Sequence, residues 1–250
     1  MQLAPRDVDR ASEIGRAVRL MAREILGIAD ARFLIVDRRH SKWRWGDTTP
    51  RGLPVYPWKF ARDSLTVAQP PDDILAHEIG HDLFRRHVVP STRPGQYGTD
   101  APDWLDESVA IAFEDSDQKA QRRCEAFRHL KSGTLIPIDR YLTMEHPDLA
   151  ATPGDADRSR DFASSPDVSA LTPAFYAMSL AFFEYLVDRT GATSILGDIG
   201  RIAEKGEAPD RWIRSRISGT HSTDSAASLN QDFVTWLAAD ERYRCLDPNV

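Results

Sequence analysis

The sequence predicts an α+β protein that folds as one domain with two lobes, an α/β lobe over residues 1–90 and a mostly helical lobe over residues 91–250. Two patterns predict this division. Short apolar runs typical of strands occur only before residue 90, whereas later apolar residues recur at the three- and four-residue spacing of helices. A length of 250 residues suits one large domain or two small lobes. We expect a mixed sheet in the first lobe and a functional site between the lobes.

The composition is that of an ordinary globular protein, with 41% apolar and 28% charged residues, which argues against a disordered or fibrous chain. A net charge of −6 gives no general attraction to nucleic acid or to an anionic membrane. The longest strongly apolar helix candidate, Phe175–Val187, is interrupted by Glu184 and is shorter than the roughly 18–20 residues of a membrane helix. We therefore expect no membrane span.

The N-terminal 27 residues carry charges throughout and have no apolar core of the secretory type. The sequence as given predicts a cytoplasmic protein, and an exported one if a leader has been removed. The two cysteines, Cys124 and Cys245, lie far apart without metal-type spacing. The default expectation is two free thiols, with one disulfide as the alternative in an oxidising compartment.

The first lobe opens with an amphipathic helix over Asp7–Leu26, where apolar residues such as Ile14 and Val18 recur at helical spacing. Two short apolar runs, Phe33–Val36 and Ser64–Ala68, predict strands. Between them lies a turn-rich segment with several prolines. The order of these elements predicts the small α/β lobe.

Three helices follow in the middle of the chain. The first is expected over Asp72–His87, because prolines and acidic residues at its start suit a helix N-terminus. The second is expected over Trp104–Ser116 with Asp103 as its cap, and the third over Ser116–Leu130.

A segment rich in Asp, Ser, Ala and Pro, Pro147–Pro173, predicts a long loop or flap. After it the pattern is helical again. We expect helices over Pro173–Thr190, Ala192–Lys205 and Leu229–Ala239.

The most informative residues are His77-Glu78-Ile79-Gly80-His81, an HExxH motif on the first of the three middle helices. Residues four apart share a helix face, so the two imidazoles can bind one metal ion. The glutamate lies on the flank of that face, where it can act as general base on water without being a ligand. The motif therefore predicts a catalytic metal site.

Such a site needs a third protein ligand, and the sequence offers two candidates. His87 has the spacing of the metzincin signature HExxHxxGxxH, but Phe84 stands where that signature needs a turning glycine. On a continuing helix His87 would point away from the ion. Glu107 lies 26 residues after His81 on the next predicted helix, which can cross the first and bring its carboxylate to the metal. We favour Glu107.

The residues around Glu107 also carry a resemblance. Residues 104–110 read WLDESVA and are followed by Glu114, which resembles the WLNEGxAxxxE pattern that follows HExxH in gluzincins, the peptidase MA-like group that includes the gluzincin aminopeptidases. Asp and Ser replace Asn and Gly, and neither change removes the ligand. The resemblance implies a thermolysin-like zincin core and a zinc ion held by His77, His81 and Glu107. It implies a zinc metallopeptidase that hydrolyses peptide bonds.

The same resemblance implies a tyrosine on a downstream helix that stabilises the oxyanion of the reaction. Tyr176 is the matching position, and Tyr185 is the alternative on the same predicted helix. The segment with which the aminopeptidases bind a free amine has no counterpart here. An endopeptidase or a specialised processing enzyme acting on a peptide or protein is therefore expected rather than an aminopeptidase, with the oligomeric state left open.

Two rival hypotheses come from other classes. One is a catalytically silent, peptidase-like binding domain in which the 147–173 loop plugs the cleft. The other is a DNA-associated HExxH protease that uses the aromatic and basic segment Arg38–Trp45. The acidic chain disfavours nucleic acid, and Trp43 and Trp45 alternate as on one buried face of an edge strand. The remaining histidines, His40, His129, His146 and His221, are expected at the surface.

Overall fold

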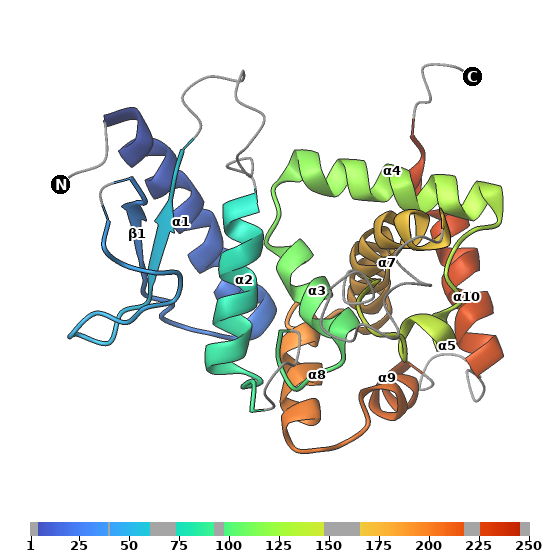
Figure 1. Ribbon diagram of the computed structural model, residues 1–250. Coiled ribbons are helices and arrows are strands. Elements are labelled where there is room, and N and C mark those ends of the chain that lie inside the picture. The colour runs from blue at the N-terminus through green and yellow to red at the C-terminus, as the bar shows by residue number, and fades with distance from the viewer. Residues whose placement is uncertain are drawn as a thin grey trace.

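The computed structural model describes residues 5–39, 41–60, 74–92, 98–147, 166–217 and 226–245. In these ranges the protein is mixed and mostly helical, which confirms the α+β class in general terms. Figure 1 shows α2 in the middle, with α1 and the strands on one side and the later helices on the other. The elements are α1 (Pro5–Leu26), β1 (Leu34–Asp37), β2 (Val55–Trp58), α2 (Ile74–His87), α3 (Asp103–Ala112), α4 (Ser116–Ser132), α5 (Ile138–Tyr141), α7 (Pro166–Thr190), α8 (Ile195–Glu204), α9 (Pro209–Ile217), α10 (Ala226–Ala239) and the short 3-10 helix η2 (Glu241–Tyr243).

The two strands form a parallel pair, with Leu34 opposite Val55. The first strand is where the sequence predicts it, but β2 lies in the segment expected to be turns. The backbone N–H groups of Leu34 and Arg38 donate to the carbonyls of Pro54 and Trp58. The nitrogen of Pro57 therefore falls at a position that makes no bond to β1, so a proline is tolerated in the strand. In the described ranges the sheet is parallel rather than mixed, and the expected strand Ser64–Ala68 lies outside them.

The aromatic and basic segment is not an edge strand, contrary to expectation. Residues 41–44 have no regular secondary structure, and a turn with Gly46 at a φ of 74° ends the alternation of side chains. Trp45 is 38% exposed, and its ring packs on β2 at centroid distances of 4.8 Å from Tyr56 and 6.2 Å from Trp58. Within the described residues, the two tryptophans therefore do not share a buried strand face.

Helix α2 anchors the strands through one buried carboxylate. The Tyr56 hydroxyl on β2 donates to Asp82 Oδ2 at 2.7 Å. The guanidinium groups of Arg85 and Arg86 donate to the same carboxylate. Burial alone would raise the pKa of Asp82, but these arginines and the tyrosine lower it. Through these bonds the charged Asp82 fixes the two-stranded sheet to α2.

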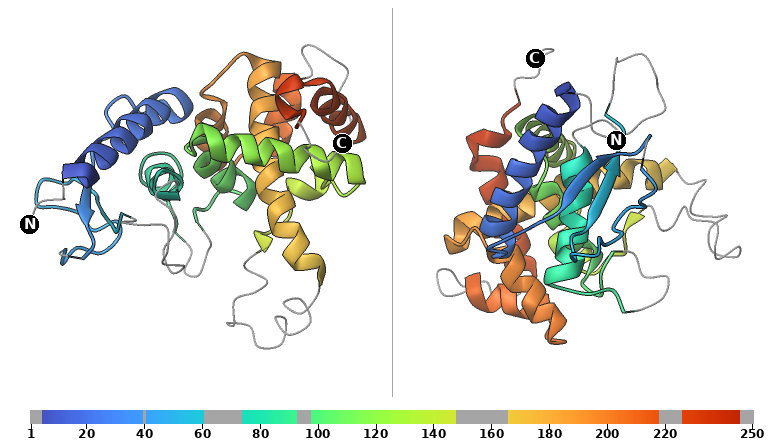
Figure 2. Two further views of the ribbon diagram at one scale, coloured as in Figure 1. Left: turned by 90° about the horizontal axis from the view of Figure 1, so that it is seen from above. Right: turned by 90° about the vertical axis from the view of Figure 1, so that its left-hand side faces the viewer.

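Helix α3 is the centre of the core. All ten of its residues are buried, because α1, α2, α7 and α8 pack around it (Figure 2). The approach of α2 is close. A Cβ atom at Gly80 would lie 3.1 Å from the Phe113 ring and 3.3 Å from the Ala110 Cα. The glycine inside the HExxH motif therefore lets the two helices approach closely.

The expected helices over residues 7–26, 72–87 and 116–130 are confirmed within a few residues, with 72 and 73 outside the described ranges. Helix α3 also forms, but it ends at Ala112 rather than at Ser116, and Asp103 is its first residue rather than its cap, which is Pro102. The Asp103 carboxylate instead accepts a bond from the backbone of a distant segment, described below.

The expectation of a loop over Pro147–Pro173 is wrong in its last part, because α7 begins at Pro166 and contains Pro173. A proline inside a helix removes one backbone bond, but α7 packs along both α3 and α4, and this packing outweighs the loss. Residues 148–165 lie outside the described ranges. Helices α8 and α10 correspond to the expected ones, while α5 and α9 were not expected. None of the helices in the described ranges is long and apolar enough to cross a membrane.

The expectation of two free thiols is wrong, because Cys124 on α4 and Cys245 form a disulfide. A buried polar cluster stands beside it. Glu184 on α7 accepts from Arg123 at 2.6 Å and from the Tyr243 hydroxyl at 2.8 Å. The disulfide and this cluster together hold the C-terminal segment against α4 and α7. The two cysteines are 121 residues apart in the chain, so no local sequence pattern could predict that they pair.

Removing the disulfide should destabilise the fold. Loss of a native disulfide that closes a long loop typically lowers the free energy of unfolding by about 2–5 kcal/mol. The double variant Cys124→Ser/Cys245→Ser should therefore unfold at lower urea concentration than the oxidised wild type. Reductant should shift the wild type toward the variant and leave the variant unchanged. Equal midpoints for the reduced and oxidised wild type would contradict this.

Candidate metal centre

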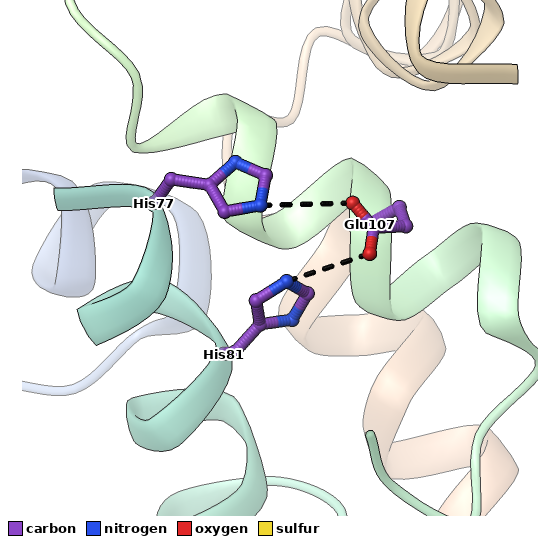
Figure 3. Close-up of side chains that lie close together, drawn as sticks. All are labelled: His77, His81 and Glu107. Carbon is purple, nitrogen blue, oxygen red and sulfur yellow. Dashed lines mark ion pairs between the residues drawn. The ribbon is translucent and has the colours of Figure 1, made fainter. Parts of the chain in front are cut away.

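Helix α2 presents both histidines of the HExxH motif to α3. His77 is buried and His81 is half-buried, and their ring centroids lie 4.9 Å apart. Figure 3 shows both imidazoles pointing toward the carboxylate of Glu107. The one-turn spacing on a regular helix brings them to the same side, as the sequence predicts.

Glu107 reaches the histidines from α3, and none of its side chain is exposed. Its Oε2 lies 3.7 Å from His77 Nε2, and its Oε1 lies 3.5 Å from His81 Nε2. Two ligand atoms about 2.1 Å from one ion at a tetrahedral angle would lie about 3.4 Å apart. All three ligand atoms lie within 4.8 Å of one another, so this group could hold a metal ion.

The far side of each imidazole is held by a carboxylate. His77 Nδ1 lies 3.1 Å from Glu114 Oε1, and His81 Nδ1 lies 2.9 Å from Asp106 Oδ1. If each Nδ1 donates its proton to the carboxylate, the Nε2 lone pair faces Glu107. Metal-binding histidines are usually oriented in this way, because the carboxylate fixes the ring and its tautomer.

These two carboxylates are themselves fixed. Arg122 on α4 donates to Glu114 at 3.3 Å, and the backbone N–H of Thr99 donates to Asp106 Oδ2 at 2.7 Å. A Cβ atom at Gly98 would overlap the Asp106 carboxylate, so only glycine leaves room for it there. The polar network thus extends from α2 through α3 to α4 and to the segment before α3.

The electrostatics of the cluster favour a positive charge. Burial lowers the pKa of His81, but Glu107, Asp106 and Glu78 outweigh it and raise the pKa to about 9. Burial would raise the pKa of Glu114, but the hydrogen bond to His77 and the charge of Arg122 lower it. Buried carboxylates that stay charged require a nearby cation, and a metal ion between the imidazoles would supply one.

Glu78 lies beside the cluster rather than in it. Its side chain is half-buried, and together with His81 it lines a cavity of about 350 Å³. Trp45 and Arg85 line other parts of this cavity. The arrangement places a carboxylate next to the metal group and open to a space that can admit water or a ligand.

Tyr176 lies on α7 beside His77. Its ring centroid is 6.5 Å from that of His77, and the Arg122 guanidinium lies 4.9 Å from its ring centre. The alternative, Tyr185, lies in the core, where its hydroxyl donates to Asp232 at 2.7 Å. Of the two tyrosines, Tyr176 is the one beside the cluster.

The other five histidines lie in different surroundings. Helix α2 continues through His87, which is exposed and outside the metal group, so the metzincin-like arrangement is not formed. His129 is half-buried and bonds Thr134. His40 and His221 lie outside the described residues. The expectation of a surface position is wrong for His146, which is 1% exposed.

Sequence reasoning missed the residues that support the ligands. Asp106 and Glu114 stand in the motif around Glu107 but had no role assigned, and Arg122 was not singled out. A signal was available for the first of these. Helix α3 reads DWLDESVAIA, and carboxylates in so apolar a helix must be buried with partners.

Comparison with protein-family models, with curated proteins and with solved structures finds no match to this chain. The function must therefore be argued from the site itself.

The candidate metal ligands can be tested by substitution. Protein purified without chelator should contain about one metal ion per chain by elemental analysis. Glu107→Ala should lose most of its metal affinity, because it removes one of three ligands. His87→Ala is the matched control and should keep the metal. The reverse pattern would favour a site built on His87.

The carboxylate behind His77 can be tested separately. Glu114→Gln should weaken metal binding about 10–100-fold, because it removes the charge that orients the imidazole. Glu125→Gln is the control, since Glu125 also pairs with Arg122 but bonds no histidine among the contacts of the described chain. Competition with a chelator of known affinity measures both constants. Equal affinities for the two variants would rule out this role for Glu114.

Proposed function

We propose that this protein is a zinc-dependent peptidase of the gluzincin type, in which His77, His81 and Glu107 hold the ion. The observation that carries the proposal is the convergence of two imidazole Nε2 atoms on one fully buried carboxylate, at 3.5 and 3.7 Å. Bound there, zinc would polarise the carbonyl of a peptide bond and lower the pKa of water.

Zinc is the ion that this ligand set suits best. Two imidazoles and one carboxylate form a common set in catalytic zinc sites, which leave one position open. Magnesium and calcium prefer oxygen ligands alone. The orienting carboxylates Glu114 and Asp106 also match the partners that zinc-binding histidines usually have.

Glu78 is the general base of the proposed reaction. It follows His77 directly on α2, belongs to neither orienting pair, and lines the cavity beside His81. Its carboxylate would take a proton from the attacking water and pass it to the nitrogen of the leaving amine. A general base must be accessible to water, and the half-buried position of Glu78 allows this.

Tyr176 is proposed as the donor to the oxyanion. Its ring lies beside His77, and a phenolic hydroxyl can donate a hydrogen bond to the negative oxygen that forms when the carbonyl is attacked. The substrate would be a peptide or protein, one residue of which would occupy the cavity beside Glu78.

The general base can be separated from metal binding. Glu78→Gln should abolish cleavage of a degenerate fluorogenic peptide library but keep about one zinc per chain, because it removes a base and not a ligand. Glu204→Gln, at an exposed position on α8, is the control and should cleave normally. Full activity of Glu78→Gln would contradict the proposed mechanism. A zinc-loaded wild type that cleaves nothing would favour the silent binding domain.

The tyrosine can be tested by removing one oxygen. Tyr176→Phe should lower kcat about 10²–10³-fold, the loss expected when one oxyanion donor is removed. The zinc content and KM should change little. Tyr185→Phe should leave kcat near that of the wild type, because that hydroxyl bonds Asp232. An unchanged kcat in Tyr176→Phe would exclude it as the donor.

A further inference from the structure

His146 is a buried histidine that the proposed reaction does not use. It lies after α5, is 1% exposed, and packs its ring against Phe175 and Tyr176 at centroid distances of 5.3 and 5.6 Å. An imidazole in such an apolar place needs a polar partner that justifies its burial.

The partner is α3. His146 Nε2 lies 3.5 Å from Glu107 Oε1, and the backbone N–H of His146 donates to Asp103 Oδ2 at 2.7 Å. Asp103 and Glu107 are four residues apart and share one face of the helix. The main chain of His146 is thus bonded to the helix that carries the glutamate, and its ring lies next to that glutamate. This also explains why Asp103 is buried.

We infer that His146 is the positioning residue of Glu107. Its Nε2–H donates to Oε1 and leaves Oε2 to the metal, so that the carboxylate binds through one chosen oxygen. The inference rests on the metal site proposed above. The present contact is about 0.5 Å longer than an ordinary N–H···O bond, and contacts of this kind commonly shorten when a catalytic site is loaded.

The assignment completes a pattern in the site. His77 has Glu114 behind it, and His81 has Asp106. With His146 behind Glu107, each of the three ligands has one partner that fixes its orientation, as metal ligands generally require. His146 is not a fourth ligand. Among the described residues, the ligand atoms within 4.8 Å of one another come from His77, His81 and Glu107, without His146.

The test compares substitutions of His146 that keep a hydrogen-bond donor at the position of Nε2 with substitutions that lose it. In His146→Gln the amide nitrogen can occupy the position of Nε2, whereas the shorter side chain of His146→Asn reaches only the position of Nδ1. We expect His146→Asn and His146→Ala to weaken zinc binding about 10–100-fold, and His146→Gln to stay within about threefold of the wild type. Zinc affinity is measured by competition with a chelator.

A second readout follows the geometry around the metal. The visible absorption of the cobalt-substituted protein should change in the Asn and Ala variants and not in the Gln variant. His129→Ala is the matched control, because that histidine bonds Thr134 and should alter neither readout. Circular dichroism identifies any variant that fails to fold. If the Ala variant does so, the comparison of Gln with Asn still decides.

The outcomes separate this inference from the proposed function. A wild type that binds no zinc overturns the metal site and the role of His146 with it. A wild type that binds zinc, with all His146 variants binding equally well, leaves the metal site standing and overturns the positioning role. Equal loss in the Gln and Asn variants also overturns it, because it would show a need for the shape of the ring rather than for its donor.

Discussion

The rest of this structure depends on the burial of acidic side chains in the central helix. Helix α3 has no exposed side, yet it carries Asp103, Asp106 and Glu107 in its first five residues. A carboxylate removed from water costs several kcal/mol unless hydrogen bonds and opposite charge replace the lost hydration. Asp103 accepts a bond from the backbone N–H of a distant segment, and Asp106 contacts the imidazole of His81. Glu107 faces the Nε2 atoms of His77 and His81, and a metal ion bound between them would supply the opposite charge that its burial calls for. The neighbouring elements are placed where they can supply those partners.

Close packing then turns this requirement into a defined site. Gly80 allows α2 to lie against α3, so the two histidines meet the glutamate at fixed distances. Arg122 extends the network to α4, where it holds Glu114 behind His77 and covers the ring of Tyr176. Because the residues of the site lie on helices and are held by their neighbours, little freedom remains to be lost when a ligand binds. The disulfide at Cys124, two residues beyond Arg122, ties the same helix to the C-terminal segment.

What the sequence predicts well is local. The two histidines of the HExxH motif share a helix face by spacing alone, and the helices that carry them and Glu107 follow from periodicity and end signals. What it misses is non-local. The pairing of Cys124 with Cys245 and the contact of His146 with Glu107 join segments far apart in the chain, and no spacing rule reports them. The strand β2 was missed for another reason. Proline predicts a turn on average, but Pro57 sits where the ladder needs no donor.

The acidic residues of the site differ in their burial. Glu114, Asp106 and Glu107 are buried and each contacts a histidine, so their positions are fixed. Glu78 is different, since it is half-buried and faces a cavity. A general base must exchange protons with water and with a leaving group, which a carboxylate held on all sides cannot do. Among the four acids that surround the two histidines, Glu78, Asp106, Glu107 and Glu114, exposure thus distinguishes the one that water can reach from the three that are held in place. The same criterion separates Tyr176, which borders the metal group, from Tyr185, whose hydroxyl is committed to Asp232.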